Sequence, residues 1–143
     1  MIKELKVKKF RPKHLKGLEL RPQDINRNIK NARKWIRHGV AYSFFDDEQI
    51  VFCGGVVFLS DGIGEAWIIC DANIRKYVRW LYKYSKEYLN RIRKDFKLHR
   101  IQCTVRSGWD EAEIFVQNLN FKKEGFLQKY IGKQNHYLYA RVW

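Results

Sequence analysis

Residues 64–80, GEAWIICDANIRKYVRW, form a strand-to-helix junction whose residue types could hold an anion. An apolar run stops at Asp71, and a basic helical pattern begins within a few residues. Many α/β folds bind a phosphate at such a junction, because the first backbone N–H groups of a helix have no partner inside it. Glycines usually let the backbone close on the ligand there. This stretch has none between Gly64 and Gly108, so its residues both suggest a phosphate site and lack its usual loop.

The other reactive side chains show no site by their spacing. Each of the three cysteines, Cys53, Cys70 and Cys103, lies in an apolar, strand-like run. Their odd number and the absence of a C-x-x-C pair predict three small buried side chains. The four histidines are scattered without metal-ligand spacing, and we expect no metal.

The elements that must position the junction can be predicted from periodicity and turn residues. Residues 74–97 carry apolar residues on one helical face and Lys and Arg on the other, which predicts a long amphipathic helix packed on a sheet. Paired glycines at 54 and 55 inside a strand indicate a bulge or a close backbone approach. The predicted strands are an edge strand at 3–10, a hairpin over 40–62, 64–70, 99–106 and a hairpin over 121–143. The predicted helices are 12–20, 22–38, 74–97 and 110–120.

The resulting order is β-α-α-β-β-β-α-β-α-β-β. The segment 64–106 reads as strand, helix, strand, which predicts two parallel strands joined by a right-handed crossover. The full chain of 143 residues has the length of one domain, 1–143.

This element order resembles that of the GNAT N-acetyltransferase superfamily over nearly the full chain. The likeness is sharpest in DEAEIFVQNLNFKKEGF (110–126), which is similar to the family's N-x-x-A-x-x-x-Y-x-x-x-GF-x-x-EG segment, and RPKHL after the first strand looks like the usual opening. The resemblance implies an α+β fold, an α/β/α sandwich. Its mixed, mostly antiparallel, twisted sheet would have about seven strands, with four helices. It also implies an acetyl-CoA-dependent N-acetyltransferase.

The pattern is closer still to the GNAT-like internal virion proteins of tailed phages. Three segments carry this likeness: LRPQDINRNI, then AWIICDANIRKYVRWLYKYSKEYLNRIRKDF, then EAEIFVQNLNF. In that branch the strand also passes directly into a long basic helix. This resemblance implies a virion component or a host-directed factor.

The superfamily resemblance also implies site residues. Glu65 opens the fourth strand, where some GNAT enzymes place a glutamate that deprotonates the amine. Arg75 and Lys76 could meet the diphosphate of acetyl-CoA as side-chain cations, and Asp71 or Asn73 could cap the helix. The positions matching the family's cofactor-binding segment are Ile69, Cys70, Asp71, Asn73, Arg75 and Lys76.

The sequence also departs from an active acetyltransferase. The family's glycine-rich pyrophosphate loop is missing, and its general-acid tyrosine falls on Val116, which cannot protonate a thiolate. The family's GF glycine is Asn120, and the leading asparagine of that helix falls on Trp109. These departures favour a non-catalytic or weakly active GNAT-fold protein of phage type with a degenerate acetyl-CoA site. An active N-acetyltransferase acting on an amine of a small molecule or protein is the alternative, and a basic nucleic-acid-binding module is a second one.

Charge is unevenly distributed along the chain. The net charge is +14; residues 39–72 hold six acids and no Lys or Arg, whereas residues 1–38 hold 13 Lys and Arg against three acids. Such basic segments suggest an anionic partner, such as nucleic acid, or a protein or virion component. No apolar run reaches a membrane span, and the basic N-terminus has no apolar signal region, so we expect a protein of the host cytoplasm or virion interior that is not secreted. Pairing of an exposed terminal strand, HYLYARVW (136–143), would allow a homodimer.

Overall fold

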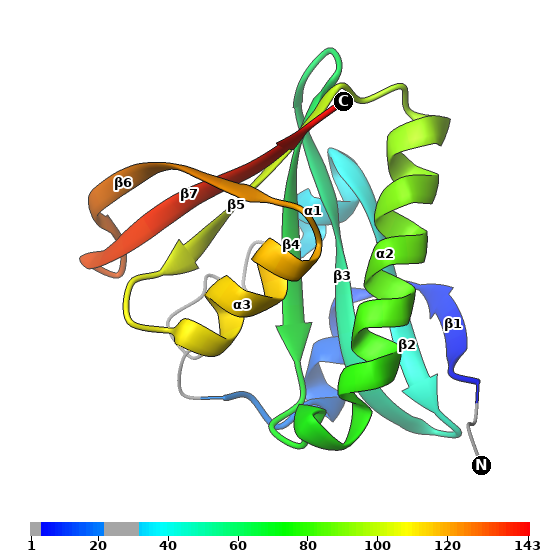
Figure 1. Ribbon diagram of the computed structural model, residues 1–143. Coiled ribbons are helices and arrows are strands. Elements are labelled where there is room, and N and C mark those ends of the chain that lie inside the picture. The colour runs from blue at the N-terminus through cyan, green and yellow to red at the C-terminus, as the bar shows by residue number, and fades with distance from the viewer. Residues whose placement is uncertain (1–3, 22–31) are drawn as a thin grey trace.

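The computed structural model describes residues 4–21 and 32–143. One seven-stranded sheet, in the order β1-β2-β3-β4-β5-β7-β6, organises the fold (Figure 1). The strands are β1 (Lys6–Lys9), β2 (Gly39–Asp46), β3 (Gln49–Ser60), β4 (Ile63–Cys70), β5 (Arg100–Arg106), β6 (Lys122–Ile131) and β7 (Gln134–Val142). The helices are η1 (Pro12–Gly17), α1 (Ala32–Arg37), η4 (Ile74–Tyr77) followed by α2 (Val78–Asp95), and α3 (Asp110–Asn118).

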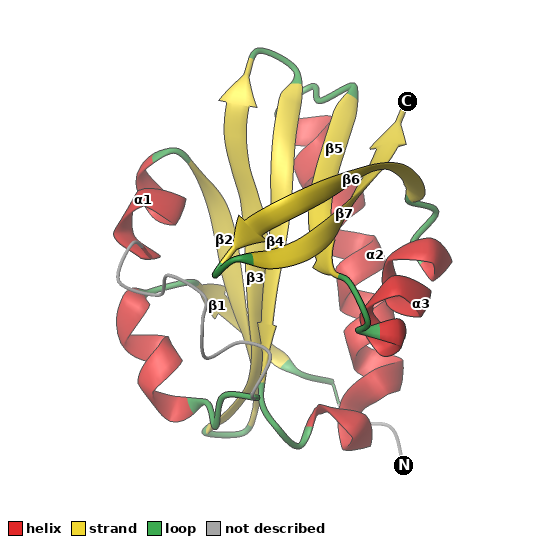
Figure 2. Ribbon diagram, turned by 90° about the vertical axis from the view of Figure 1, so that its left-hand side faces the viewer, coloured by secondary structure: helices red, strands yellow, loops and turns green. Residues whose placement is uncertain are grey.

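Helices cover both faces of the sheet. Figure 2 shows η1 and α1 on one face and α2 with α3 on the other. The α+β fold, the mixed and mostly antiparallel seven-stranded sheet and the element order are confirmed. The first helix is a 3₁₀ helix and ends at Gly17 rather than near Leu20. Of the helix expected over 22–38, residues 22–31 lie outside the described residues, and Ala32–Arg37 are helical.

The β2–β3 hairpin depends on a glycine. Gly55 pairs with Ala41, and a Cβ atom at Gly55 would lie 2.2 Å from the carbonyl oxygen of Val40 and 2.6 Å from the Cα of Ala41. The close backbone approach predicted for this glycine pair is therefore confirmed. The irregularity between β2 and β3 lies elsewhere, between Phe44 and Phe45.

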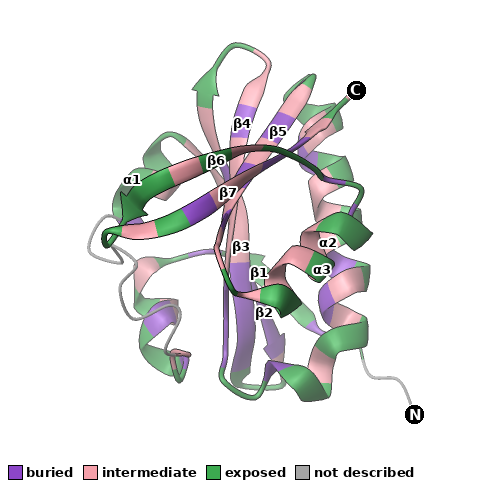
Figure 3. Cartoon of the chain, turned by 60° about the vertical axis from the view of Figure 1, so that its left-hand side comes forward, coloured by how far each residue is buried: buried purple, intermediate pink, exposed green. Residues whose placement is uncertain are grey.

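The sheet separates two apolar layers, and buried residues concentrate along its central strands (Figure 3). Strand alternation sends Ile69 to the layer under η1 and α1, whereas Ile101 and Val105 pack beneath α2 and α3. The buried residues of α2 are Leu81, Tyr84 and Ile92. The amphipathic pattern predicted Leu81 and Ile92 on the apolar face, but not Tyr84. All three cysteines are buried, which confirms that expectation.

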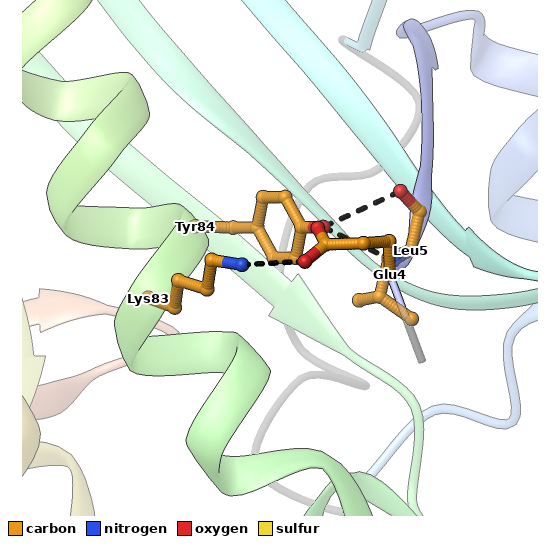
Figure 4. A network of polar contacts seen from close by, with 4 residues as sticks. All are labelled: Glu4, Leu5, Lys83 and Tyr84. Carbon is orange, nitrogen blue, oxygen red and sulfur yellow. Dashed lines mark hydrogen bonds and ion pairs between the residues drawn. The ribbon is translucent and has the colours of Figure 1, made fainter. Parts of the chain in front are cut away.

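A polar network attaches the N-terminal segment to α2 (Figure 4). The Tyr84 hydroxyl donates to the carboxylate of Glu4 at 2.5 Å and accepts from the backbone N–H of Leu5 at 3.0 Å. Lys83 forms an ion pair with the same carboxylate at 2.8 Å. This network fixes α2 relative to β1, at the edge of the sheet.

A second network attaches α3 to β7. Tyr139, whose side chain is fully buried, donates its hydroxyl to the Glu113 carboxylate at 2.5 Å, and the Lys123 ammonium lies 3.0 Å from that carboxylate. The hydrogen bond from Tyr139 lowers the pKa of Glu113; burial opposes this shift and Lys123 adds to it. This network positions α3 beside the sheet.

The lowered pKa of Glu113 predicts acid-sensitive stability. A carboxylate with a lowered folded-state pKa stabilises the fold above its unfolded-state pKa, and this contribution is lost as pH falls through the folded-state pKa. Glu113→Gln should therefore lower the free energy of unfolding by about 1 kcal/mol at pH 7 and by progressively less below about pH 4. Urea unfolding at several pH values measures this difference. Glu111→Gln, an exposed carboxylate on the same helix, is the control and should change stability by less than about 0.5 kcal/mol.

The expected dimer edge is placed differently by the structure. Strand β7 pairs with β5 on one side and with β6 on the other, so residues 136–143 are not an exposed edge strand as the sequence suggested. The two edges of the described sheet are β1 and β6. A homodimer stays a prediction, but an exposed terminal strand no longer supports it.

Candidate functional site

The central feature of the site is a gap between two parallel strands. Only Ile63–Glu65 of β4 pair with Arg100–Gln102 of β5. Beyond these three pairs β4 continues to Cys70 and β5 to Arg106, and Figure 1 shows the two strands diverging, with α3 near the opening. Past Glu65 and Gln102, β4 and β5 no longer pair with each other, and they leave a wedge between them whose apex is at Glu65.

A cavity of about 310 Å³ occupies this wedge and extends beneath α2. Residues from both faces of β4 line it: Glu65 and Trp67 from one face, Ala66 and Ile68 from the other. Its lining is mostly apolar. The residues that β5 and α3 contribute are Cys103, Thr104, Val105, Glu111, Ala112, Phe115 and Val116. A narrow apolar cavity with a few polar groups is typical of a small-molecule site.

Glu65 belongs to a chain of polar side chains on the sheet face that carries η1 and α1. The Gln102 amide donates to the Glu65 carboxylate at 3.3 Å, and the Arg100 Nε donates to the Gln102 carbonyl oxygen at 3.1 Å. Arg100 also binds both carboxylate oxygens of Glu124, at 2.7 and 3.1 Å. The chain orients Glu65 at the wedge apex while leaving its second carboxylate oxygen available to a ligand.

Two aromatic residues add polar groups near Glu65. The indole N–H of Trp67, two residues along β4, is buried and has no hydrogen-bond partner in the described structure. Trp67 packs against Trp35 and Phe10, with ring centroids 4.3 and 5.2 Å apart. Burial raises the pKa of the Tyr130 phenol, and the negative charge of Glu65 raises it further. Because the indole N–H of Trp67 has no partner in the described structure, it can donate to a bound ligand.

The junction residues after β4 are occupied by contacts within the protein. Ile69 and Cys70 are buried in opposite core layers. The buried carboxylate of Asp71 accepts hydrogen bonds from the backbone N–H groups of Glu19, at 2.8 Å, and Asn73, at 3.0 Å. Asn73 precedes η4 but makes no side-chain capping bond. Asp71 thus closes the junction on itself.

The two predicted cations point to different places. Arg75 lines the wedge cavity and forms an ion pair with Glu111 of α3 at 2.6 Å, its side chain 83% exposed. Lys76 instead lines a separate polar cavity of about 410 Å³ with Asp71 and Tyr77. Both residues lie in the 3₁₀ helix η4, where successive side chains point about 120° apart, so the two cations face different cavities.

Two residues of the wedge lining concern the general acid, which the family resemblance places at Val116 and which a valine cannot supply. Val116 lines the cavity, so its position in the helix corresponds to the one expected for an acid, although its side chain supplies none. Tyr82, which sequence reasoning left unassigned, also lines the cavity and packs against Phe115, with ring centroids 5.0 Å apart. Its hydroxyl accepts a hydrogen bond from the Asn118 amide at 3.1 Å, so its own proton is available for donation. Only its place at the boundary of the polar and apolar faces of α2 could have marked it.

Within residues 4–21 and 32–143 there is no group of three or more His, Cys, Asp or Glu side chains placed to hold a metal ion. Over the same residues, no helix has the length and apolar character needed to cross a membrane.

No family model matches the sequence, and no curated protein matches it. Solved structures do match, over nearly the whole chain. Ard1 from Thermoplasma volcanium has a TM-score of 0.79 at 15% identity, over 98% of both chains.

Two further structures match with similar coverage. A variant of the spermidine N-acetyltransferase SpeG from Vibrio cholerae has a TM-score of 0.73 at 12% identity, over 97% of this chain and 94% of that one. A GNAT-family acetyltransferase from Bacillus anthracis has a TM-score of 0.70 at 15% identity, over 99% and 96%. The chain has the fold of the GNAT acetyltransferases.

Proposed function

We propose that this protein is an acetyl-CoA-dependent N-acetyltransferase that acts on an amine. The observation that carries the proposal is the wedge between β4 and β5, with an apolar cavity beneath it and Glu65 at its apex. The sequence alone favoured a non-catalytic interpretation, because it revealed the missing glycines but not the cavity. The fold shared with the solved spermidine N-acetyltransferase SpeG supports the same proposal.

The residues suggest a separate approach for each substrate. The apolar residues of α3 and β5 suit the pantetheine arm of the donor, whose thioester supplies an activated acyl carbon. Glu65 and Trp67 lie on the other face of β4, where an amine could approach them. Trp67 would hold a ligand oxygen with its unpartnered indole N–H.

Proton transfer is assigned to two side chains. The amine nitrogen bonds to the acyl carbon, the carbon–sulfur bond breaks, and the products are an amide and a thiol. Glu65 takes the proton that leaves nitrogen, directly or through one water. Tyr82 donates the proton that the sulfur gains, since its hydroxyl keeps its own hydrogen after accepting from Asn118.

Glu65→Gln tests this assignment. Thiol release from acetyl-CoA is measured with a panel of primary amines that includes polyamines, amino acids and peptides. The variant should lose about 10²- to 10⁴-fold in kcat/KM while keeping its affinity for coenzyme A, because glutamine cannot accept the proton. Glu87→Gln, an exposed carboxylate of α2, is the matched control and should turn over normally. Equal turnover by Glu65→Gln and the unmodified chain would remove Glu65 from the mechanism.

A second candidate function is favoured by one observation. The junction at Asp71 is closed by its own carboxylate, which is what a GNAT-fold protein without catalysis would retain. Such a protein would serve as a virion-associated or host-directed factor of phage type. It would show no acetyl transfer to any amine of the panel and would co-purify with virions or a partner protein.

A further inference from the structure

The backbone of the junction after β4 has few hydrogen-bond donors left for a ligand. The N–H groups of Asp71 and Ala72 donate to the carbonyl oxygens of Val51 and Glu19, at 2.9 and 2.8 Å. The N–H of Asn73 donates to the Asp71 carboxylate at 3.0 Å. The N–H groups of residues 74 and 76 donate to carbonyl oxygens within the junction, at 3.0 and 3.2 Å. A diphosphate would have to displace these five bonds to reach those N–H groups.

The charges around the junction add little to phosphate binding. Asp71 places a buried negative charge where a phosphate would lie against the junction. Arg75 already has Glu111 as its partner, and both side chains are mostly exposed. Lys76 lines the other cavity. Among the described residues, the other cation in the wedge lining is Arg21, whose guanidinium lies 4.7 Å from the ring centroid of Trp109.

The wedge itself is built differently from the junction. It is open and largely apolar, and its lining includes Ala66 and Val105 beside residues of α3. A pantetheine arm is a flexible, uncharged chain whose methyl groups and two amides suit such a lining. The part of the site that fits the thioester end is present, whereas the part that would fit the diphosphate end is occupied.

We infer that the wedge recognises its donor through the pantetheine arm alone, so that acyl thioesters without a nucleotide are donors nearly equivalent to acetyl-CoA. This inference rests on the proposed function and specifies its donor class. It is carried by the junction hydrogen bonds of Asp71 and by the apolar cavity beside it.

The difference between the two modes of recognition is large enough to measure. A backbone N–H donated to a phosphate oxygen contributes about 10- to 150-fold in affinity, so two such bonds would favour coenzyme A over pantetheine by at least about 100-fold. An exposed arginine contributes at most about five-fold, and salt weakens it. We therefore expect a ratio below about 10-fold at 0.15 M salt, falling toward one at 0.5 M.

Isothermal titration of the full chain with coenzyme A and with pantetheine, at both salt concentrations, measures the ratio. A ratio below about 10-fold at 0.15 M salt that falls toward one at 0.5 M supports the inference. A ratio above about 10-fold at 0.5 M salt overturns it and leaves the proposed function intact. Failure of both compounds to bind overturns the proposed function, and the inference with it.

Two matched variants measure how much the exposed positive charge of Arg75 contributes to coenzyme A binding. Arg75→Ala should weaken coenzyme A binding by at most about five-fold and leave pantetheine binding unchanged. Arg79→Ala, an exposed arginine of α2 outside the cavity lining, should change neither. A loss of more than about 100-fold in Arg75→Ala would overturn the inference by making one phosphate contact dominant.

Discussion

Ala112→Trp is expected to abolish binding of coenzyme A and of pantetheine while leaving the protein folded. Ala112 is half-buried on α3 and lines the wedge cavity, whose volume is only about 310 Å³. An indole at this position would occupy the space that the proposed function assigns to the pantetheine arm. Because α3 has no fully buried residues, the larger side chain can be accommodated without disrupting the core.

Thermal unfolding gives a direct readout of this change. A ligand present at about 100 times its dissociation constant stabilises the native state by roughly 2.7 kcal/mol, or about 6–10 °C in a domain of this size. The unmodified chain should show this shift with saturating coenzyme A, and Ala112→Trp should show none. Without ligand, the melting temperatures of the two should agree within about 3 °C.

Ile114→Trp supplies the matched control. Ile114 lies on the same helix, is 55% exposed and does not line the cavity. The same large side chain placed there should leave the ligand-induced shift intact. If coenzyme A stabilised Ala112→Trp as strongly as the unmodified chain, the wedge would not be the donor site.

The fold could be predicted because its signals are local. The apolar run of β4 and the helical period of residues 74–97 each follow from a short stretch of chain, and the structure places both elements as expected. The start of that helix differs: Ile74–Tyr77 form a 3₁₀ turn before α2. Asp71 binds the N–H of Asn73 just ahead of this turn, an Asx contact that the sequence presents only as a candidate cap.

The site could be predicted only in part, because it depends on pairings distant in sequence. The family resemblance implied Glu65 as a candidate general base, and the structure places it at the wedge apex; its role stays a prediction. The cavity could not be predicted, because it exists only where the pairing of β4 with β5 stops. Gln102 and Tyr82 were missed for the same reason: their roles come from contacts with residues about 36 positions away.

Asp71→Ala is expected to be among the most destabilising substitutions of a charged residue in this chain. The Asp71 carboxylate is buried and accepts two backbone hydrogen bonds, one from Glu19, 52 residues earlier, and one from Asn73. Removing it leaves both N–H groups without this partner in a partly buried place. A hydrogen bond to a charged group contributes about 1.5–3 kcal/mol, so the loss should be about 3–4 kcal/mol.

Urea unfolding measures this loss, and two further variants interpret it. Asp71→Asn keeps one carbonyl oxygen as an acceptor but turns its amide donor toward the other N–H, and should cost about half as much. Asp95→Ala, an exposed aspartate at the end of α2, should cost less than about 0.5 kcal/mol. A loss below about 1 kcal/mol in Asp71→Ala would mean that the junction is not held closed by this carboxylate. The backbone N–H groups of the junction would then be open to a phosphate. In that case the missing glycines alone would not decide which acyl thioester the protein takes.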